Sequence, residues 1–279
     1  MTETPGAVVS AIERGAARRH TRHAAGAMIW RIWGEGPPVV LLHGTFGSWT
    51  HWIRNIRPLA AHFTVLAPDM PGFGASDNLP EPHTAEGLAD AVAEGLDALV
   101  PSPAGLSIAG FSFGGIIGGL VAARLGSRVR TAVLVGAGGL AVPFPPLPLL
   151  VRVGAGGSDD DVRRAHAENL RRLMFADPEA VDDVAVHVQA ENVRLSRFKA
   201  GSIPTSDVLQ RALPSVKARL AGIWGASDAF TSPYVEERRR LLASFYPALD
   251  FRVVDGAGHW VIYEAAEAVN TALLDMLRR

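Results

Sequence analysis

Short apolar runs alternate with longer stretches of helical spacing along most of this chain. Continuous apolar runs are typical of strands that are buried on both faces of a parallel sheet. The stretches between them carry apolar residues on one helical face. The predicted strands are 38–42, 63–67, 106–109, 131–136, 219–224 and 251–254, and the predicted helices are 51–61, 84–100, 115–123, 234–245 and 265–277. This order predicts an α/β fold with a mostly parallel sheet and helices on both faces.

Two strand-like segments, 17–21 and 27–33, precede this series and predict a hairpin with its turn around 24–26. Basic side chains gather here, namely Arg14, Arg18, Arg19, His20, Arg22 and His23. Charged side chains protect the edge strand of a sheet from pairing with other chains. We therefore interpret the basic cluster as a solvated sheet edge rather than a binding patch.

The stretch 140–205 interrupts the alternation of strands and helices. It begins with an apolar, proline-rich segment, 140–151, and continues with helix-like segments at 159–175 and 178–192. A segment of this length with its own helical pattern is too long for a loop. We predict a helical cap at 140–205, inserted into a core formed by residues 1–139 and 206–279.

The composition narrows the function classes. The chain has 279 residues, of which 48% are hydrophobic and 20% are charged, and its formal net charge is −1. This balance produces no general attraction to nucleic acid, so we expect no nucleic-acid partner. The chain has no cysteine, which excludes disulfides, a thiolate nucleophile and cysteine-based metal sites.

One uncharged segment, 132–151, has the length of a membrane span. Prolines at 143, 145, 146 and 148 interrupt it, and one helix cannot continue through them. We therefore expect no membrane span. Residues 1–10 lack the apolar core of a secretory signal, which favours a cytoplasmic location.

The segment 110–114, Gly-Phe-Ser-Phe-Gly, places Ser112 in the spacing G-x-S-x-G. It follows an apolar run and precedes a helical one, which is the context of a nucleophile elbow. Glycine on both sides of Ser112 permits a sharp turn. A glycine-rich strand-to-helix connection is the alternative interpretation, so the case depends on partner residues elsewhere in the chain.

Two candidate partners follow later strands. Asp228 comes after the predicted strand 219–224, and His259 comes after 251–254, behind two glycines. Taken alone, Asp228 would be interpreted as a turn or helix-capping residue. A nucleophile elbow requires an acid and a histidine in loops after later strands, so we predict that Asp228 and His259 join Ser112 as the catalytic residues.

A third element follows the predicted strand 38–42, where the turn 43–47 begins with His-Gly. We predict that the backbone N–H of Thr45 or Phe46 faces the serine, with the N–H of Phe113 as the second donor. Backbone donors on a rigid scaffold stabilise the developing charge of an oxyanion.

These motifs together resemble those of α/β-hydrolase-fold enzymes with a cap domain. The resemblance rests on the His-Gly turn, the loop 68–77, the elbow 110–114, the W-G-x-x-D turn 224–228 and the G-x-G-H turn 256–259. The chain order Ser112, Asp228, His259 is that of nucleophile, acid and base in this superfamily. A serine at the elbow argues against haloalkane dehalogenases and epoxide hydrolases, which carry an aspartate there.

The resemblance implies a serine hydrolase that needs no metal and no organic cofactor. His259 would take the proton of Ser112, and Asp228 would hold the imidazole in the required tautomer. Attack of Ser112 on a carbonyl would then form an acyl-enzyme that water releases.

Aromatic residues beside these motifs predict an apolar pocket lined by Trp49, Phe111 and Trp260. Such a lining suits an acyl or aryl group. The leading hypothesis is therefore hydrolysis of a carboxylic ester of a small, mostly apolar molecule. A homodimer is compatible with the sequence, which does not define the oligomeric state.

Two other functions stay open. The His259-Trp260 pair also resembles the carbon–carbon bond hydrolases that cleave ring-fission products, which are vinylogous diketone acids. Those enzymes have a longer, proline-containing oxyanion loop and a cap arginine, for which Arg194 and Arg197 are the nearest residues here. The third hypothesis is a ligand-binding protein on a hydrolase fold, with Ser112 reactive but turning over slowly.

Overall fold

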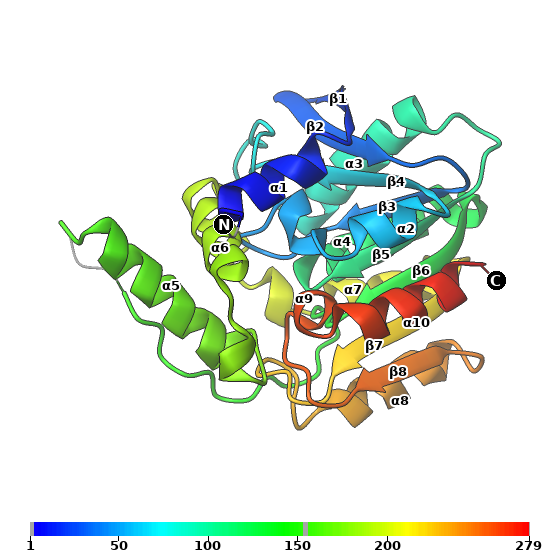
Figure 1. The fold of residues 1–279 in the computed structure, drawn as a ribbon. Coiled ribbons are helices and arrows are strands. Elements are labelled where there is room, and N and C mark those ends of the chain that lie inside the picture. Colours follow the sequence, from blue (N-terminus) through cyan, green and yellow to red (C-terminus); the bar gives the residue numbers. More distant parts are fainter. Residues whose placement is uncertain (1–2, 153–155, 279) are drawn as a thin grey trace.

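An eight-stranded sheet forms the centre of the fold (Figure 1). The computed structural model describes residues 3–152 and 156–278. The strands are β1 (Ala17–His23), β2 (Gly26–Trp33), β3 (Pro38–Leu42), β4 (Thr64–Asp69), β5 (Leu106–Phe111), β6 (Val129–Val135), β7 (Arg219–Gly225) and β8 (Asp250–Val254). They lie in the order β1-β2-β4-β3-β5-β6-β7-β8. The pairs β1–β2 and β2–β4 are antiparallel and the others parallel, which confirms the predicted fold class.

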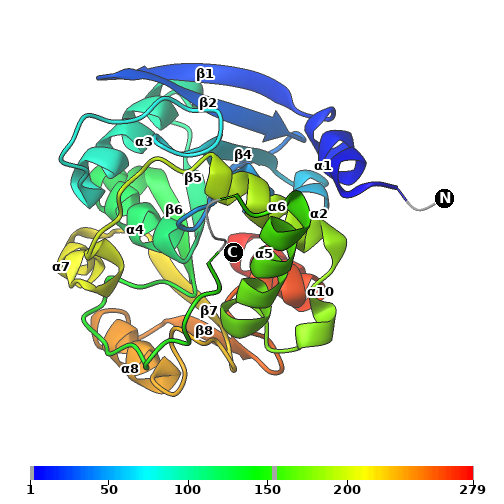
Figure 2. The ribbon, with the colours of Figure 1, turned by 90° about the vertical axis from the view of Figure 1, so that its left-hand side faces the viewer.

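Helices cover both faces of this sheet. The α-helices are α1 (Pro5–Glu13), α2 (Ile56–Ala60), α3 (Ala85–Leu99), α4 (Phe113–Leu125), α5 (Asp159–Leu173), α6 (Asp183–Arg194), α7 (Val208–Ala212), α8 (Val235–Phe245), α9 (Val261–Glu264) and α10 (Ala266–Arg278). The 3-10 turns are η1 (Trp49–Trp52), η2 (Gly126–Arg128), η3 (Pro178–Ala180), η4 (Ile203–Thr205) and η5 (Leu213–Ser215). In Figure 2, α3, α4 and α8 lie on one side of the sheet, and α1, α2 and α10 lie on the other. No helix within the described ranges is long and apolar enough to cross a bilayer.

Neighbouring residues of the central strands enter opposite apolar layers. Val40 and Leu42 of β3 belong to the layer that contains α3 and α4. Val39 and Leu41 belong to the layer that contains α2 and α10. All four side chains are at most 1% exposed. This burial on both faces explains why the strand has an uninterrupted apolar sequence.

The predicted hairpin is present at one end of the sheet. β1 pairs with β2, with Ala17 opposite Ile32 and His23 opposite Gly26. The first four residues of β1 are exposed, and β1 is the outermost strand. The basic side chains of β1 therefore lie on an exposed edge, where their charge opposes pairing with another chain.

Helix α1 is an element that the apolar spacing does not predict. Its start nevertheless has a local signal, because the Thr4 side chain accepts the N–H of Ala7 and Pro5 is the first helical residue. Threonine is a favoured N-cap, and proline is favoured at the first position of a helix. The helix then buries Ile12 against the sheet layer that contains α2 and α10.

The predicted helix 51–61 is wrong. The chain forms the 3-10 turn η1 and then the short helix α2. In a continuous helix, Pro58 could not donate a hydrogen bond to the carbonyl of Arg54, and its ring would clash with that carbonyl. The Arg54 carbonyl instead accepts the side-chain N–H of Asn270. Proline thus stands in the first turn of α2, where its missing N–H is tolerated.

The chain leaves the sheet between β6 and β7, in the region predicted as a cap. Helices α5 and α6 occupy the two helical stretches expected there, and α5 stands away from the sheet in Figure 1. Ser158 and Asp161 form a capping box at the start of α5. Residues 153–155 lie outside the described residues. The division into a core and a cap at 140–205 stays a prediction.

The carboxyl ends of β3, β5, β7 and β8 lie at the same edge of the sheet, because these strands run parallel. Ligands of open α/β sheets bind beyond the carboxyl ends of the strands. The turn 43–47, Ser112, Asp228 and His259 each follow one of these four strands. The fold therefore brings those segments to one place.

A buried ion pair joins β2 to β4. The guanidinium of Arg31 lies 2.9 Å from the carboxylate of Asp69, and their side chains are 8% and 2% exposed. The same carboxylate accepts the backbone N–H groups of Trp49 and Ala75. Asp69 therefore holds the segment after β3 and the loop after β4 against the sheet.

We expect Arg31→Met to lower the free energy of unfolding by about 3 kcal/mol, because it leaves a buried carboxylate without its cation. Urea unfolding measures this change. Glu13→Gln is the control, since Glu13 also contacts Arg31 but is 42% exposed. That variant should lose less than about 1 kcal/mol. Equal losses in the two variants would contradict the assignment.

Candidate active site

Ser112 occupies a strained turn between β5 and α4. Its φ is 53° and its ψ is −116°, a conformation that residues other than glycine rarely adopt. Its backbone N–H donates to the carbonyl of Val135 on the neighbouring strand β6. A Cβ added at Gly110 would collide with the backbone of Gly114 and Gly115. The glycines of the G-x-S-x-G motif therefore permit the close approach of strand and helix that the turn requires.

Three side chains from three separate loops form a hydrogen-bonded chain. The Oγ of Ser112 lies 2.9 Å from the Nε2 of His259. The Nδ1 of His259 lies 2.8 Å from the Oδ2 of Asp228. The carboxylate can only accept, so the partners assign the imidazole proton to Nδ1 and leave Nε2 to accept from the serine. The structure thus brings the three predicted catalytic residues together.

Asp228 and His259 are both shielded from solvent, with residue exposures of 0% and 5%. The second carboxylate oxygen of Asp228 accepts the backbone N–H of Phe230 at 2.8 Å. The acid is therefore oriented by an imidazole on one oxygen and a peptide group on the other.

Aromatic rings lie against the imidazole of His259. The centroid of Phe111 is 5.1 Å from it and that of Phe230 is 4.4 Å from it. The sequence patterns do not identify Phe230 as part of the site. The sequence indicates only that Phe230 lies two residues after Asp228. Its contact with His259 depends on how the loops of Asp228 and His259 pack together.

The loop after β3 packs against the elbow. A Cβ at Gly44 would meet the Cβ of Ser112 and the ring of Phe111 at 3.2 Å. Phe46 has a φ of 53°, and its side chain is 52% exposed. Phe113 is the first residue of α4, where a backbone N–H has no acceptor within the helix. The role of Thr45, Phe46 and Phe113 as oxyanion donors stays a prediction.

The predicted pocket residues are all buried. Trp49 is 3% exposed, Phe111 is 1% exposed and Trp260 is 0% exposed. Trp49 packs on the ring of Trp33, at 5.5 Å, and Trp260 packs on Tyr263, at 4.4 Å. Such contacts are those of core residues, whereas Phe111 also contacts the candidate catalytic histidine. Contact of the three with a substrate stays a prediction.

A carboxylate joins the histidine loop to the end of α5. Glu264 accepts the backbone N–H of Gly258 at 2.6 Å, and also those of Ala176 and Asp177. In addition, the N–H of Trp260 donates to the carbonyl of Met174. Sequence spacing gives no indication that Glu264 contacts Ala176 and Asp177 or that Trp260 contacts Met174, because these partners lie 86 to 88 positions apart. The turn that carries His259 is thus attached to the segment between β6 and β7, residues 136–218, which is the inserted region.

Two buried histidines lie behind the loop after β3. His43 accepts the backbone N–H of Met70 on Nε2 and donates from Nδ1 to the carbonyl of Gly44. Burial lowers the pKa of His43 to about 4. Burial also holds the pKa of His51 well below its usual value, and the nearby His43 and His259 add to this effect. Both rings are therefore neutral at physiological pH.

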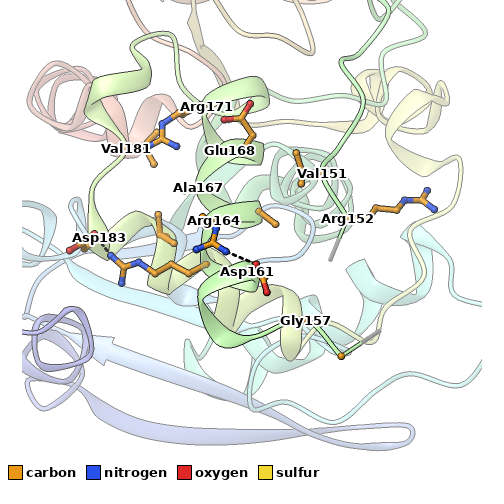
Figure 3. A pocket seen from close by; sticks show the side chains of 14 residues that line it. Val151, Arg152, Gly157, Asp161, Arg164, Ala167, Glu168, Arg171, Val181 and Asp183 are labelled. Carbon is orange, nitrogen blue, oxygen red and sulfur yellow. Dashed lines mark hydrogen bonds and ion pairs between the residues drawn. The ribbon is translucent and has the colours of Figure 1, made fainter. Parts of the chain in front are cut away.

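A separate groove of about 850 Å³ lies on the inserted region (Figure 3). It is bordered by α5, by the start of α6 and by residues on both sides of 153–155. Figure 3 labels Arg164 and Asp161, which form an ion pair on α5. Ser112 and His259 do not line this groove. In the described part of the chain, no three His, Asp or Glu side chains are grouped as a metal site would require.

Comparison with known proteins agrees with this architecture. A model of the alpha/beta hydrolase family matches residues 39–272, which is most of the chain. The chain therefore belongs to this family, and it is a hydrolase. It is 32% identical to a 2-hydroxy-6-oxo-6-phenylhexa-2,4-dienoate hydrolase of Burkholderia cepacia, over 88% of each chain.

Solved structures of two kinds of hydrolase share the fold. The carboxylesterase CesB of Bacillus subtilis superposes with a TM-score of 0.75 at 20% identity, over 98% of this chain and 95% of the other. The meta-cleavage product hydrolase CumD of Pseudomonas fluorescens gives a TM-score of 0.70 at 23% identity, over 93% and 97% of the two chains. The fold is therefore common to enzymes that act on different bonds.

The buried His43 should make stability depend on pH. Its pKa of about 4 in the folded protein lies below the value of about 6.5 expected in the unfolded chain. The unfolded chain then binds more protons between these values, so this contribution is fully present above pH 6.5 and is lost as the pH falls towards 4. We expect a loss of about 3 kcal/mol from this group.

His43→Gln should therefore flatten the fall in unfolding free energy between about pH 7 and about pH 5, measured by urea titration. His62→Gln is the control, because His62 is exposed. An unchanged slope in His43→Gln would rule out this contribution.

Proposed function

We propose that this protein is a serine hydrolase that cleaves carboxylic esters of small, mostly apolar molecules. The observation that carries the proposal is the hydrogen bond of 2.9 Å between Ser112 Oγ and His259 Nε2, at a strained elbow. A serine hydroxyl is a weak nucleophile until a base takes its proton. The neutral Nε2 of His259 is the base in this scheme.

The first half of the reaction forms an acyl-enzyme. Ser112 attacks the ester carbonyl while its proton passes to His259. Asp228, buried and hydrogen-bonded to Nδ1, balances the charge of the imidazolium that forms. The imidazolium then protonates the leaving alkoxide, and the alcohol departs.

The second half returns the enzyme to its starting state. A water molecule gives a proton to His259 and attacks the acyl carbonyl. The proton then passes back to Ser112 Oγ as the carboxylic acid leaves. Each tetrahedral intermediate places negative charge on the former carbonyl oxygen.

Backbone N–H groups stabilise that oxygen in the proposed mechanism. One donor is Phe113, at the N-terminus of α4, and the other is Thr45 or Phe46 in the loop that packs on Ser112. Each fixed donor of this kind is worth roughly 2.7–4 kcal/mol of activation free energy. The N-terminal end of α4 also favours negative charge.

The hydrogen bonds of two arginines favour an ester as the substrate over a diketone acid. Arg194 is paired with Glu191 on an exposed part of α6. Arg197 donates to the backbone carbonyls of Gly74 and Ser76. Both are engaged by protein groups, whereas cleavage of a diketone acid calls for a cap arginine that binds the substrate carboxylate.

Carbon–carbon bond cleavage is the second candidate function. The observation that favours it is the 32% identity to the dienoate hydrolase of Burkholderia cepacia across most of both chains. Such a reaction would use the same serine, base and acid. The two functions therefore differ in the substrate that the inserted region admits.

Ser112→Ala should abolish labelling by a fluorophosphonate probe and lower ester hydrolysis by about 10⁴-fold or more, because the nucleophile is lost. Gel fluorescence and a chromogenic ester assay measure the two effects. Ser244→Ala, an exposed serine on α8, is the control and should behave as the wild type. Labelling of Ser112 without repeated turnover on any substrate would instead favour a ligand-binding protein.

A substrate panel separates the two candidate reactions. We expect higher kcat/KM for aryl esters of short acids than for ring-fission dienoates. Arg194→Gln should change kcat/KM for esters by less than about twofold, since an exposed ion pair contributes little. A strong preference for the dienoate that is lost in Arg194→Gln or Arg197→Gln would establish carbon–carbon cleavage instead.

A further inference from the structure

His51 is a buried histidine that takes no part in the proposed proton transfers. Its residue exposure is 2%, and it lies in η1, shortly after the loop that packs on Ser112. Its Nε2 has no hydrogen-bond partner among the described residues. A buried polar atom without a partner is rare in native proteins and calls for a reason.

The other nitrogen of His51 makes one directed contact. The backbone N–H of Gly44 donates to Nδ1 at 3.1 Å. Because Nδ1 accepts, the single proton of the neutral ring is on Nε2. A protonated ring would present a second N–H to Gly44 and would break this bond. Burial, which disfavours the charged form, therefore preserves the acceptor.

The imidazole ring of His51 also packs directly against the backbone of the loop after β3. A Cβ added at Gly47 would overlap the ring of His51, so the backbone of Gly47 lies directly on the imidazole. Gly44 is tied to the same ring by its N–H. Both ends of the segment that carries Thr45 and Phe46 are thus held by one side chain.

The same residue contacts the other two parts of the site. Its ring centroid is 5.5 Å from that of Phe111, next to Ser112, and 5.2 Å from that of Trp260, next to His259. Its backbone carbonyl accepts the indole N–H of Trp260 at 3.1 Å. His51 therefore connects the loop after β3, the elbow and the histidine turn.

We propose that His51 is a positioning residue that fixes the oxyanion loop through its Nδ1 acceptor. The inference rests on the proposed function, because it assigns Thr45 or Phe46 as an oxyanion donor. Glycine at 44 and 47 leaves the loop backbone free to rotate. The Gly44 N–H to Nδ1 bond and the contact with Gly47 remove that freedom, so the donor meets the oxyanion without reorganisation.

Three substitutions at this position test the proposal. His51→Phe keeps a ring against Gly47 but has no acceptor. His51→Asn carries an amide oxygen near the place of Nδ1, and His51→Gln carries its amide farther out, near the place of Nε2. We expect kcat of His51→Phe and His51→Gln to fall by roughly 10- to 100-fold with KM changed less than about threefold. His51→Asn should recover most of kcat.

The readouts are kcat and KM for an aryl ester, the rate of fluorophosphonate labelling, and the urea midpoint of each variant. A role in stability alone would shift the midpoint and leave kcat of the folded protein unchanged. Wild-type kcat in His51→Phe, or equal losses in the Asn and Gln variants, would overturn the proposal. If His51→Phe does not fold, the comparison of Asn with Gln decides the question.

The outcome for the wild type separates this inference from the proposed function. A wild-type protein that neither labels at Ser112 nor hydrolyses an ester would refute the serine-hydrolase function itself. A wild type that labels and turns over, together with fully active His51 variants, would refute only the role of His51.

Discussion

The turn at Ser112 is the constraint on which the rest of the site depends. A serine with positive φ is strained, and it persists only where the surrounding structure enforces it. Here α4 lies so close to the end of β3 that a side chain at Gly114 would collide with the carbonyls of Leu42 and His43. The nucleophile strand, its helix and β3 are therefore held together by contacts that only glycine permits. Ser112 consequently projects between the loop after β3 and the turn of His259.

Direct backbone contacts also join the other segments of the site. A Cβ at Gly225, before the turn of Asp228, would collide with the carbonyl of Gly258, and one at Gly258 would collide with backbone at the end of α5. The acid turn, the histidine turn and the inserted region are thus in contact without intervening side chains. Glu264 adds three backbone hydrogen bonds across this junction. The position of the turn that carries His259 is therefore fixed by direct backbone contact with the segment that follows α5.

Most of the fold and the candidate catalytic residues could be predicted because they follow from local patterns. Buried strands require apolar runs, and the elbow requires glycine around Ser112. The predicted helix at 51–61 is wrong for a local reason, because Pro58 interrupts it. The spacing of apolar residues does not reflect this effect of proline. The packing of the aromatic residues could not be predicted in this way, because position beside a motif does not determine which face a side chain occupies. Trp49 and Trp260 adjoin the site in sequence but are buried in the core.

The sequence by itself determined the order of strands and helices, the strained turn and the identity of the three residues that meet there. The order of elements and the strained turn depend on the repeat of apolar positions and on short-range steric rules. Asp228 and His259 are indicated by the resemblance of their turns and of the chain order to those of α/β-hydrolases. Only the tertiary structure decided that Phe230 covers the imidazole, that Glu264 links the histidine turn to α5 and that His51 accepts from Gly44. Those contacts join segments whose meeting depends on the packing of the whole sheet edge, and packing at that range leaves no periodic signal in the chain.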